Sequence, residues 1–206
     1  MNDKVKQRHE LRPASRYTPD VKSCRGSIPG IANGWCHTLD AAEYQRLASL
    51  VSNGNIIEIG SYEGLSLYHI KDICKANNAK LYCVDFIAWP KLVENCEAWG
   101  IPFINKPSVD AALDFPDDFF DLVYIDADHH KSECAWDIWA WLPKLKKTGT
   151  ICGHDFDNKN VRRALKYVFG TIEPDVINVG GFVWSVTNPH EKVKCWPEQA
   201  KYNDAK

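Results

Sequence analysis

The stretch that decides the fold of this 206-residue chain is Asn55-Ile-Ile-Glu-Ile-Gly60-Ser-Tyr-Glu-Gly64-Leu-Ser66. Its first five residues are rich in β-branched side chains, which predicts a buried strand. Two glycines then interrupt the apolar run, and Leu67, Ile70 and Cys74 recur afterwards at helical spacing. A strand that turns through glycines into a helix is the first half of a βαβ unit, so the sequence predicts a parallel α/β sheet.

The alternation of strands and helices continues on both sides of this stretch. Ahead of it, a helix is expected from near Asp40 up to Asn53-Gly54, because Asp40 and Glu43 have capping-box spacing. Behind it we expect four further strands, two helices and a closing hairpin. The fold class predicted is α/β, a Rossmann-like, doubly wound and mostly parallel sheet. The expected strands are Lys80–Asp85, Ile101–Ile104, Asp121–Asp126 and, after a turn at Lys147–Gly149, Thr150–Cys152. The expected helices are a Trp-rich one that ends at Pro143 and another at Val161–Phe169. The hairpin is expected from Asp175–Val179 and Phe182–Thr187.

Composition and charge favour one globular domain that does not bind nucleic acid. Hydrophobic residues make up 45% and charged residues 25%, and 25 Lys and Arg nearly balance 27 Asp and Glu, which leaves a net charge of -2. No overall positive field is available to attract a phosphate backbone. The charge is unevenly placed, since residues 1–30 hold seven basic residues against three acids. We therefore expect a basic N-terminal arm over 1–30, the folded domain over 31–188 and a polar tail over 189–206.

The eight cysteines and the apolar runs indicate a cytoplasmic protein. The cysteines are scattered, and no Cys-x-x-Cys pair or clustered zinc spacing occurs. Buried, reduced thiols are the expected state. No run approaches the roughly 18 apolar residues that would cross a bilayer. We therefore expect no membrane partner.

The first glycine loop favours a cationic ligand. A dinucleotide site needs Gly-x-Gly-x-x-Gly, but Glu58 stands here in place of the first glycine. A carboxylate at that position would repel phosphate and attract an ammonium or sulfonium group. S-adenosylmethionine carries both cations and no phosphate, and Gly60 and Gly64 permit a close backbone approach.

The ends of the second and third strands offer groups for the rest of such a cofactor. Asp85 can accept hydrogen bonds from both ribose hydroxyls, and Phe86 can cover the adenine face. Ser108 follows the third strand, where an adenine edge would lie. A solvated carboxylate is the alternative interpretation of Asp85.

Acids and imidazoles gather at the ends of the fourth and fifth strands. The fourth ends in Asp126-Ala-Asp128-His129-His130 and the fifth in Gly153-His154-Asp155-Phe-Asp157. Neighbouring like charges must be paired, protonated or neutralised by a cation. Three alternatives remain open: Asp126 and Asp155 bind a divalent metal with His154 or water; His129 or His154 is a general base without metal; or Asp128 merely caps the helix that begins near Lys131.

Together these motifs resemble those of the class I S-adenosylmethionine-dependent methyltransferases. The resemblance lies in Ile57–Ser66, Ile125–His129 and Gly153–Asp155, and it extends over about residues 30–188. It implies a seven-stranded sheet whose last strand is antiparallel. It also implies that Glu58, Gly60 and Ser61 hold the methionine moiety, that Asp85 holds the ribose, and that Asp126 lies beside the transferred methyl group. Tyr62, Gly64, Phe86 and Ser108 complete the expected cofactor site.

The same resemblance implies methyl transfer to a hydroxyl oxygen of a small molecule or a sugar. Related catechol-type and macrolide-sugar-type O-methyltransferases bind magnesium through the fourth-strand Asp and an acidic or amide pair after the fifth strand. That pair is His154-Asp155 here, so a histidine departs from the oxygen-only pattern. The alternatives are a Rossmann-like cofactor-binding protein without catalysis and a nicotinamide-dependent oxidoreductase. Amino-group methylation is disfavoured, because Asp126-Ala-Asp128-His129 replaces the Asn/Asp-Pro-Pro-aromatic pattern typical of that chemistry.

Overall fold

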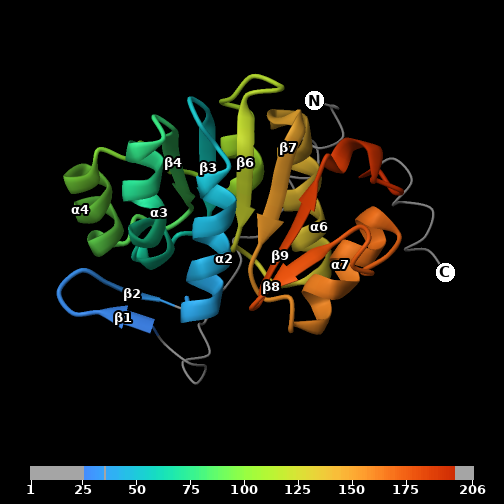
Figure 1. The fold of residues 1–206 in the computed structure, drawn as a ribbon, viewed down its shortest axis with the longest axis horizontal. Helices are drawn as coiled ribbons and strands as arrows, with labels where there is room; N and C mark the ends of the chain where they lie inside the picture. Colours follow the sequence, from blue (N-terminus) through green and yellow to red (C-terminus); the bar gives the residue numbers. More distant parts are fainter. Residues whose placement is uncertain (1–25, 35, 198–206) are drawn as a thin grey trace.

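The structure, a computed structural model, describes residues 26–34 and 36–197, so most of the predicted basic arm lies outside the described residues. A seven-stranded sheet forms the centre, in the order β5-β4-β3-β6-β7-β9-β8 (Figure 1). The strands are β3 Asn55–Ile59, β4 Lys80–Asp85, β5 Phe103–Asn105, β6 Phe120–Ile125, β7 Leu145–Gly153, β8 Asn178–Gly180 and β9 Val183–Thr187.

The direction of the strands confirms the predicted doubly wound topology. β5, β4, β3, β6 and β7 pair in parallel, whereas β9 runs antiparallel to both of its neighbours, β7 and β8. Within the seven-stranded sheet, the first strand in the sequence is β3, followed by β4 and β5 on one side of it and then by β6 on the other side. In such sheets ligands bind beyond the carboxyl ends of the strands, at the point where the winding reverses. A ligand site is therefore expected beyond the carboxyl ends of β3 and β6.

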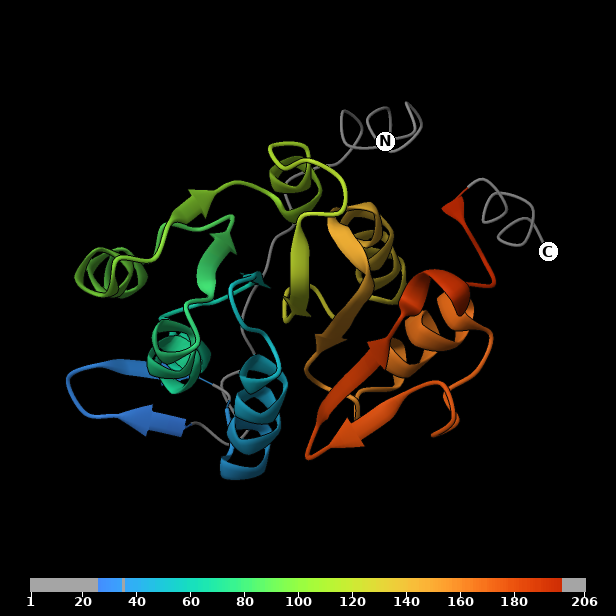
Figure 2. The ribbon, with the colours of Figure 1, turned by 45° about the horizontal axis from the view of Figure 1, so that its top comes forward.

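Helices cover both faces of the sheet (Figures 1 and 2). On one face, Tyr44 and Leu67 belong to a core cluster that also contains the strand residue Ile56. On the other, Trp141 and Leu165 pack with Ile57 and its strand neighbours. Adjacent strand residues face opposite sides, so Ile56 and Ile57 enter different clusters. The first face carries α2 Thr38–Ser49, α3 Leu65–Ala76 and α4 Pro90–Trp99, and the second carries α5 Ser108–Ala112, α6 Lys131–Trp141 and α7 Lys159–Phe169.

A short hairpin precedes the sheet and lies beside α3. Its strands are β1 Gly26–Ile28 and β2 Ala32–Gly34 (Figure 2). Ala32 shares a small hydrophobic cluster with Leu65 at the start of α3. Asn33 donates from its backbone and its side chain to Glu63 Oε2, at 2.8 and 3.0 Å. The hairpin is therefore attached directly to the glycine loop that follows β3.

Two local predictions differ from the structure. The turn expected at Lys147–Gly149 is part of β7, because the pairing of β6 with β7 shifts register between Phe120 and Leu122 and the strand continues past the irregularity. α2 begins earlier than expected: its N-cap is His37, whose backbone N–H donates to Asp40 Oδ2 at 3.1 Å. Asp40 is thus the third residue of the first turn and not the cap.

The packed structure continues past the boundary predicted at residue 189. Pro189–Glu191 forms a 3₁₀ turn, η2, and the backbone of Cys195 accepts a hydrogen bond from Trp139 Nε1 at 2.8 Å. The N–H groups of Lys194 and Cys195 both donate to Val168 O. These contacts place the segment up to Cys195 against α6 and α7. Among the described residues, no helix has the length and apolar character needed to cross a membrane.

Candidate active site

The glycine loop after β3 is built by close backbone packing. Gly60 has a φ of +85°, and a Cβ atom there would collide with the carbonyl oxygen of Asp126 at the end of β6. Its N–H donates to Val84 O at 2.8 Å, while Asp126 N donates to Ile59 O at 2.8 Å. A glycine is required because the loop passes between the ends of β4 and β6.

Glu58 is a fully buried acid immediately before this loop. Ser66 Oγ on α3 donates to Glu58 Oε1 at 2.6 Å. Burial raises the pKa of the Glu58 carboxyl to about 7, although the hydrogen bond from Ser66 opposes the shift. The second carboxylate oxygen makes no hydrogen bond of good geometry among the described residues, although the buried hydroxyls of Ser61 and Tyr44 lie close enough to lower the pKa of the carboxyl. Buried polar atoms are almost always satisfied, so this group can take a polar ligand.

Asp85 joins the loops after β3 and β4. Its carboxylate accepts from Tyr62 N at 3.0 Å and from Ile87 N at 2.9 Å, and burial raises the pKa of this group despite those bonds. Beside it, Phe86 exposes 53% of its surface, and the ring of Tyr62 meets Trp89 edge-on at 4.9 Å. The phenyl group of Phe86 can stack on a base, and the carboxylate of Asp85 can bind the ribose hydroxyls, so the two together can hold a nucleoside.

Ser108 is the first residue of α5, and its hydroxyl oxygen accepts from Trp141 Nε1 at 3.0 Å. That bond fixes the position of the hydroxyl and leaves its proton available to an acceptor on a ligand. The side chain is only half-buried, so it remains accessible from the loop after β5.

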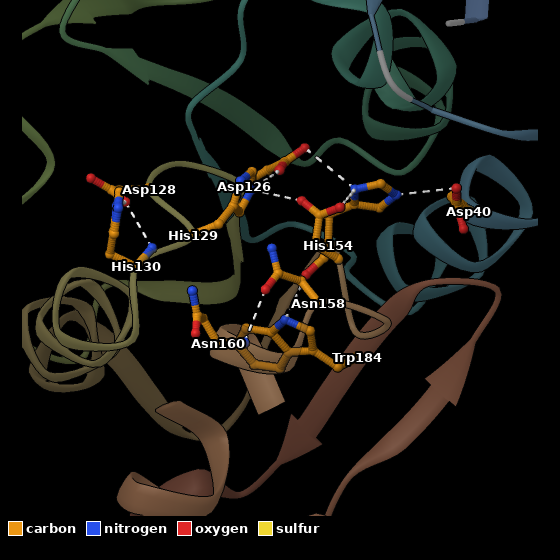
Figure 3. A network of polar contacts seen from close by, with 10 residues as sticks. Asp40, Asp126, Asp128, His129, His130, His154, Asn158, Asn160 and Trp184 are labelled. Atoms are coloured by element: carbon orange, nitrogen blue, oxygen red, sulfur yellow. Dashed lines mark hydrogen bonds and ion pairs between the residues drawn. The ribbon is translucent and has the colours of Figure 1, made fainter. Parts of the chain in front are cut away.

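The acids and imidazoles at the ends of β6 and β7 meet in one network (Figure 3). His129 Nε2 lies 2.6 Å from Asp155 Oδ2 and 3.5 Å from Asp126 Oδ1. His154 Nδ1 lies 3.5 Å from Asp155 Oδ1 and 4.0 Å from Asp126 Oδ2. These strands are parallel neighbours in which Ile125 pairs with Gly153, so the residues that follow them come together.

Three of these residues are also arranged to hold a cation. Asp126, His154 and Asp155 each offer a ligand atom, and the three atoms lie within 4.8 Å of one another. They are the three residues for which the sequence predicts metal binding. Asp155 adopts a φ of +59°, a conformation that Asp tolerates better than most residues.

Asp40 is a member of this network that the sequence does not reveal. It comes from α2, is almost completely buried, and accepts from His154 Nε2 at 3.1 Å (Figure 3). The two residues are 114 positions apart, and Asp40 has the spacing of an ordinary helix cap. Only the docking of α2 against the sheet brings them together.

The carboxylates hold both imidazoles in the protonated form. Burial opposes protonation of His129, but its contacts with Asp126 and Asp155 outweigh that effect and raise its pKa to about 10. The same acids together with Asp40 raise the pKa of His154 to about 11, again against the effect of burial. Burial would raise the pKa of Asp155, yet hydrogen bonds from the two histidines lower it. An imidazolium has no lone pair, so neither ring can accept a proton at neutral pH while all these contacts persist.

Asp128 and His130 form a separate pair. Asp128 Oδ1 lies 2.8 Å from His130 N and 2.6 Å from His130 Nδ1, and both side chains are displaced from the cluster around His154 (Figure 3). The N-cap of α6 is His130, so the alternative in which Asp128 occupies the cap position is wrong.

One family model matches the part of the chain that carries the candidate site. Residues 57–156 match the family model described as a methyltransferase domain. The matched segment runs from β3 to the loop after β7, so it contains the glycine loop, Asp85 and the acidic cluster.

Solved structures share the fold at low sequence identity. A protein from Corynebacterium glutamicum superposes with a TM-score of 0.59 at 19% identity, covering 72% of this chain and 79% of that one. CalS11, a TDP-rhamnose 3'-O-methyltransferase of calicheamicin biosynthesis, gives 0.58 at 14% identity, with 72% and 78% covered. A candidate O-methyltransferase from Klebsiella pneumoniae gives 0.55 at 22% identity, with 74% and 82% covered. The seven-stranded sheet is thus the Rossmann-like methyltransferase fold. No curated protein sequence matches the chain.

Proposed function

We propose that this protein is an S-adenosylmethionine-dependent methyltransferase that methylates a hydroxyl oxygen of a small molecule or sugar. The observation that carries the proposal is the unsatisfied, buried Glu58 carboxylate at the end of β3, next to the acidic cluster of β6 and β7. A cationic cofactor suits these acidic strand ends, whereas a phosphate-bearing dinucleotide would be repelled. The match of residues 57–156 to a methyltransferase domain supports the same class.

The cofactor would be held by the residues around the glycine loop. Glu58 and Ser61 would accept and donate hydrogen bonds to the amino-acid end, and Asp85 would bind the ribose hydroxyls through its remaining lone pairs. Phe86 would stack on the adenine. Gly60, Tyr62 and Gly64 give the loop its shape, and Ser108 would contact the adenine edge. When bound, the cofactor would supply an electrophilic methyl group on its sulfonium sulfur, and the neutral thioether of S-adenosylhomocysteine would be the leaving group.

The acceptor would approach from the side of Asp126. Its hydroxyl oxygen forms a bond to the methyl carbon as the carbon–sulfur bond breaks, and the hydroxyl proton is released. His129 is the imidazole placed to manage that proton, because its side chain is 36% exposed whereas that of His154 is only 5% exposed. His154 would act by holding its neighbours.

A divalent ion is part of the proposal. Asp126, His154 and Asp155 would hold it, and it would supply a positive charge that makes a nearby hydroxyl more acidic. With their lone pairs engaged in this way, the carboxylates that now keep His129 protonated would attract its proton less, which lowers the pKa of that imidazole toward the range in which it can act as a base.

Oxygen as the reacting atom is supported by two distant structural neighbours. One is a TDP-rhamnose 3'-O-methyltransferase and the other a candidate O-methyltransferase. Their identities of 14% and 22% carry the fold, so the acceptor itself has to be identified by experiment.

Ligand titration tests the cofactor assignment. We expect S-adenosylmethionine and S-adenosylhomocysteine to bind the purified protein and NADH not to bind. Asp85→Ala should weaken S-adenosylmethionine binding tenfold or more, since each lost charge-assisted hydrogen bond is worth about 1.5–3 kcal/mol. Asp72→Asn, on the exposed side of α3, is the control and should bind as the wild type does. Binding of NADH alone would refute the proposal, and a screen of glycans and phenols with labelled cofactor, with and without EDTA, would identify the acceptor.

A further inference from the structure

Asp40 is held from three directions, and each contact uses a defined carboxylate oxygen. Oδ1 accepts from Phe182 N in the β8–β9 connection at 2.7 Å. Oδ2 accepts from His37 N at 3.1 Å and lies 3.1 Å from His154 Nε2. With only about 1% of Asp40 exposed, the carboxylate has a fixed position relative to both the helix and the hairpin.

This carboxylate determines which nitrogen of His154 faces the acidic cluster. An ionised carboxylate can only accept, so the nitrogen beside it, Nε2, must carry a hydrogen. The other nitrogen, Nδ1, lies 3.5 Å from Asp155 Oδ1 and 4.0 Å from Asp126 Oδ2. Nδ1 is therefore the nitrogen that faces the cluster, and a cation bound there would replace the proton that this atom carries in the imidazolium form. Metal-binding histidines commonly have such a carboxylate on the opposite ring nitrogen.

The distances suit a small divalent ion. Ligands at roughly 2.0–2.2 Å from an ion lie at most about 4.4 Å apart, when they are on opposite sides of it. The separations of Nδ1 from the two carboxylate oxygens, 3.5 and 4.0 Å, fall within that limit, whereas the three ligand atoms together lie within 4.8 Å of one another, so binding would draw the set slightly closer. The set contains one imidazole nitrogen and two carboxylates. Imidazole favours ions such as Fe²⁺, Co²⁺, Ni²⁺ and Zn²⁺, whereas Mg²⁺ prefers oxygen alone.

We propose that Asp40 is a positioning residue that keeps His154 in the Nε2–H tautomer, so that Nδ1 joins Asp126 and Asp155 in a site selective for a first-row transition ion over Mg²⁺. This inference rests on the proposed function, because it assumes that the cluster binds a metal. It assigns to Asp40 a role other than capping α2. It also gives a physical meaning to the histidine that stands where related enzymes have an oxygen donor.

Metal selectivity separates this role from a purely structural one. The full-length protein is freed of metal with EDTA and titrated with Mn²⁺, Co²⁺ and Mg²⁺ by calorimetry. We expect the wild type to bind Co²⁺ at least tenfold more tightly than Mg²⁺, with Mn²⁺, which also favours carboxylate ligands, between the two. Asp40→Asn should reduce the affinity for Co²⁺ by 10–100-fold, the usual effect of losing such a partner, and change the affinity for Mg²⁺ much less. A general loosening of the fold would weaken binding of all three ions alike.

A second variant replaces the nitrogen donor itself. His154→Asn places an amide oxygen near the position of Nδ1, so the preference for Co²⁺ over Mg²⁺ should shrink toward that of an oxygen-only site. Asp128→Asn is the matched control: this acid lies in the same loop as His129 and pairs with His130, so its removal should leave all three affinities unchanged. Circular dichroism verifies that each variant is folded.

The wild-type protein provides a test that needs no variant. In the Co²⁺-loaded protein, the proton on Nε2 of a ligating His154 should give a strongly shifted NMR signal that disappears in D₂O. The proposal is overturned if this signal is absent, if Mg²⁺ binds as tightly as Co²⁺, or if folded Asp40→Asn and His154→Asn keep the wild-type selectivity. S-adenosylmethionine binding is measured on the same samples. If the protein binds S-adenosylmethionine but shows no preference for Co²⁺ over Mg²⁺, only the inference about Asp40 fails. If the protein does not bind S-adenosylmethionine, the proposed function fails.

Discussion

The buried carboxyl of Glu58 imposes a cost on folding that depends on pH. Its pKa is about 7 in the folded protein, against an ordinary value of 4.5, because burial disfavours the charged form. Between these two values the folded state binds more protons at this group than the unfolded state does. The free energy of unfolding therefore falls as pH rises from about 4.5 to 7, and the loss is complete above 7. A shift of this size corresponds to about 3 kcal/mol.

Glu58→Gln should remove this dependence. We expect the variant to gain up to about 3 kcal/mol relative to wild type between pH 4.5 and pH 8, since the amide carries no charge to desolvate. Urea denaturation at the two pH values measures the difference. Glu97→Gln, exposed on α4, is the control and should shift the free energy of unfolding equally at both. The same Glu58→Gln variant should bind S-adenosylmethionine at least tenfold more weakly. An equal stability difference at both pH values would contradict the account of Glu58 as a buried charge.

Individual site residues differ in how readily sequence reveals them. Asp126 and Asp155 are predictable neighbours because each follows an apolar strand, and the ends of neighbouring parallel strands share one edge of the sheet. Asp40 gives no such signal, because its contact with His154 depends on how α2 docks. The protonation of His129 is also inaccessible from sequence: its pKa of about 10 follows from two carboxylate contacts that only the folded loop creates.

At the scale of elements, the backbone of the glycine loop is tightly constrained where it passes between the ends of β4 and β6. Gly60→Ala meets two obstacles, the positive φ of +85° and the nearby carbonyl oxygen of Asp126. Gly100, after α4, has a φ of +68°, but no heavy atom lies within 4 Å of the place that a Cβ would take, so Gly100→Ala meets only the first. The pair therefore separates conformational strain from steric overlap.

We expect Gly100→Ala to lower the free energy of unfolding by about 1–2 kcal/mol, the cost of the left-handed conformation. Gly60→Ala should lower it by about 3 kcal/mol or more, because overpacking against a backbone atom adds to the strain. Denaturant titration of both variants measures the difference. Equal losses would mean that the loop can move away from β6, in which case its shape is not fixed by the sheet.

The elements themselves are largely readable from the sequence, and the exceptions have local causes. Strong periodicity locates α3 and α7, and the β-branched runs locate β3 and β6. The prediction of a turn at Lys147–Gly149 is wrong because cross-strand pairing carries β7 through residues that favour a turn. The spacing of Asp40 to Glu43 suits a capping box, whereas in the structure His37 takes the cap position. Tertiary contacts override a local signal in both places.

At the scale of the whole molecule, the order of the strands is predictable from the sequence, but the packing of the C-terminal segment is not. Alternating strands and helices predict a doubly wound sheet, and the antiparallel β9 follows from the resemblance to methyltransferases. The sequence after Thr187 lacks periodicity, so nothing in it indicates that Cys195 lies buried against Trp139. Such a segment is held by α6 and α7, whose surfaces exist only after the rest of the chain has folded.

The cysteines provide a measure of how completely that closed structure excludes solvent. Seven of them lie among the described residues, and all are free and buried. Burial raises the pKa of Cys36 and Cys74 to about 12, so the reactive thiolate form is scarce at neutral pH. These seven thiols should therefore resist modification by Ellman's reagent until the protein unfolds. Cys24, which lies outside the described residues, is replaced by serine so that only these seven are followed.

In Cys24→Ser we expect no thiol to react rapidly under native conditions and all seven to react together in guanidinium. The concentration of guanidinium that releases them should match the midpoint seen by circular dichroism, because both signals would report one cooperative transition. Cys195 gives the sharpest check, since it lies in the C-terminal segment that packs on α6 and α7. Rapid labelling of one thiol in this variant, lost again in Cys195→Ser, would show that the final segment opens independently while the sheet and its site remain folded.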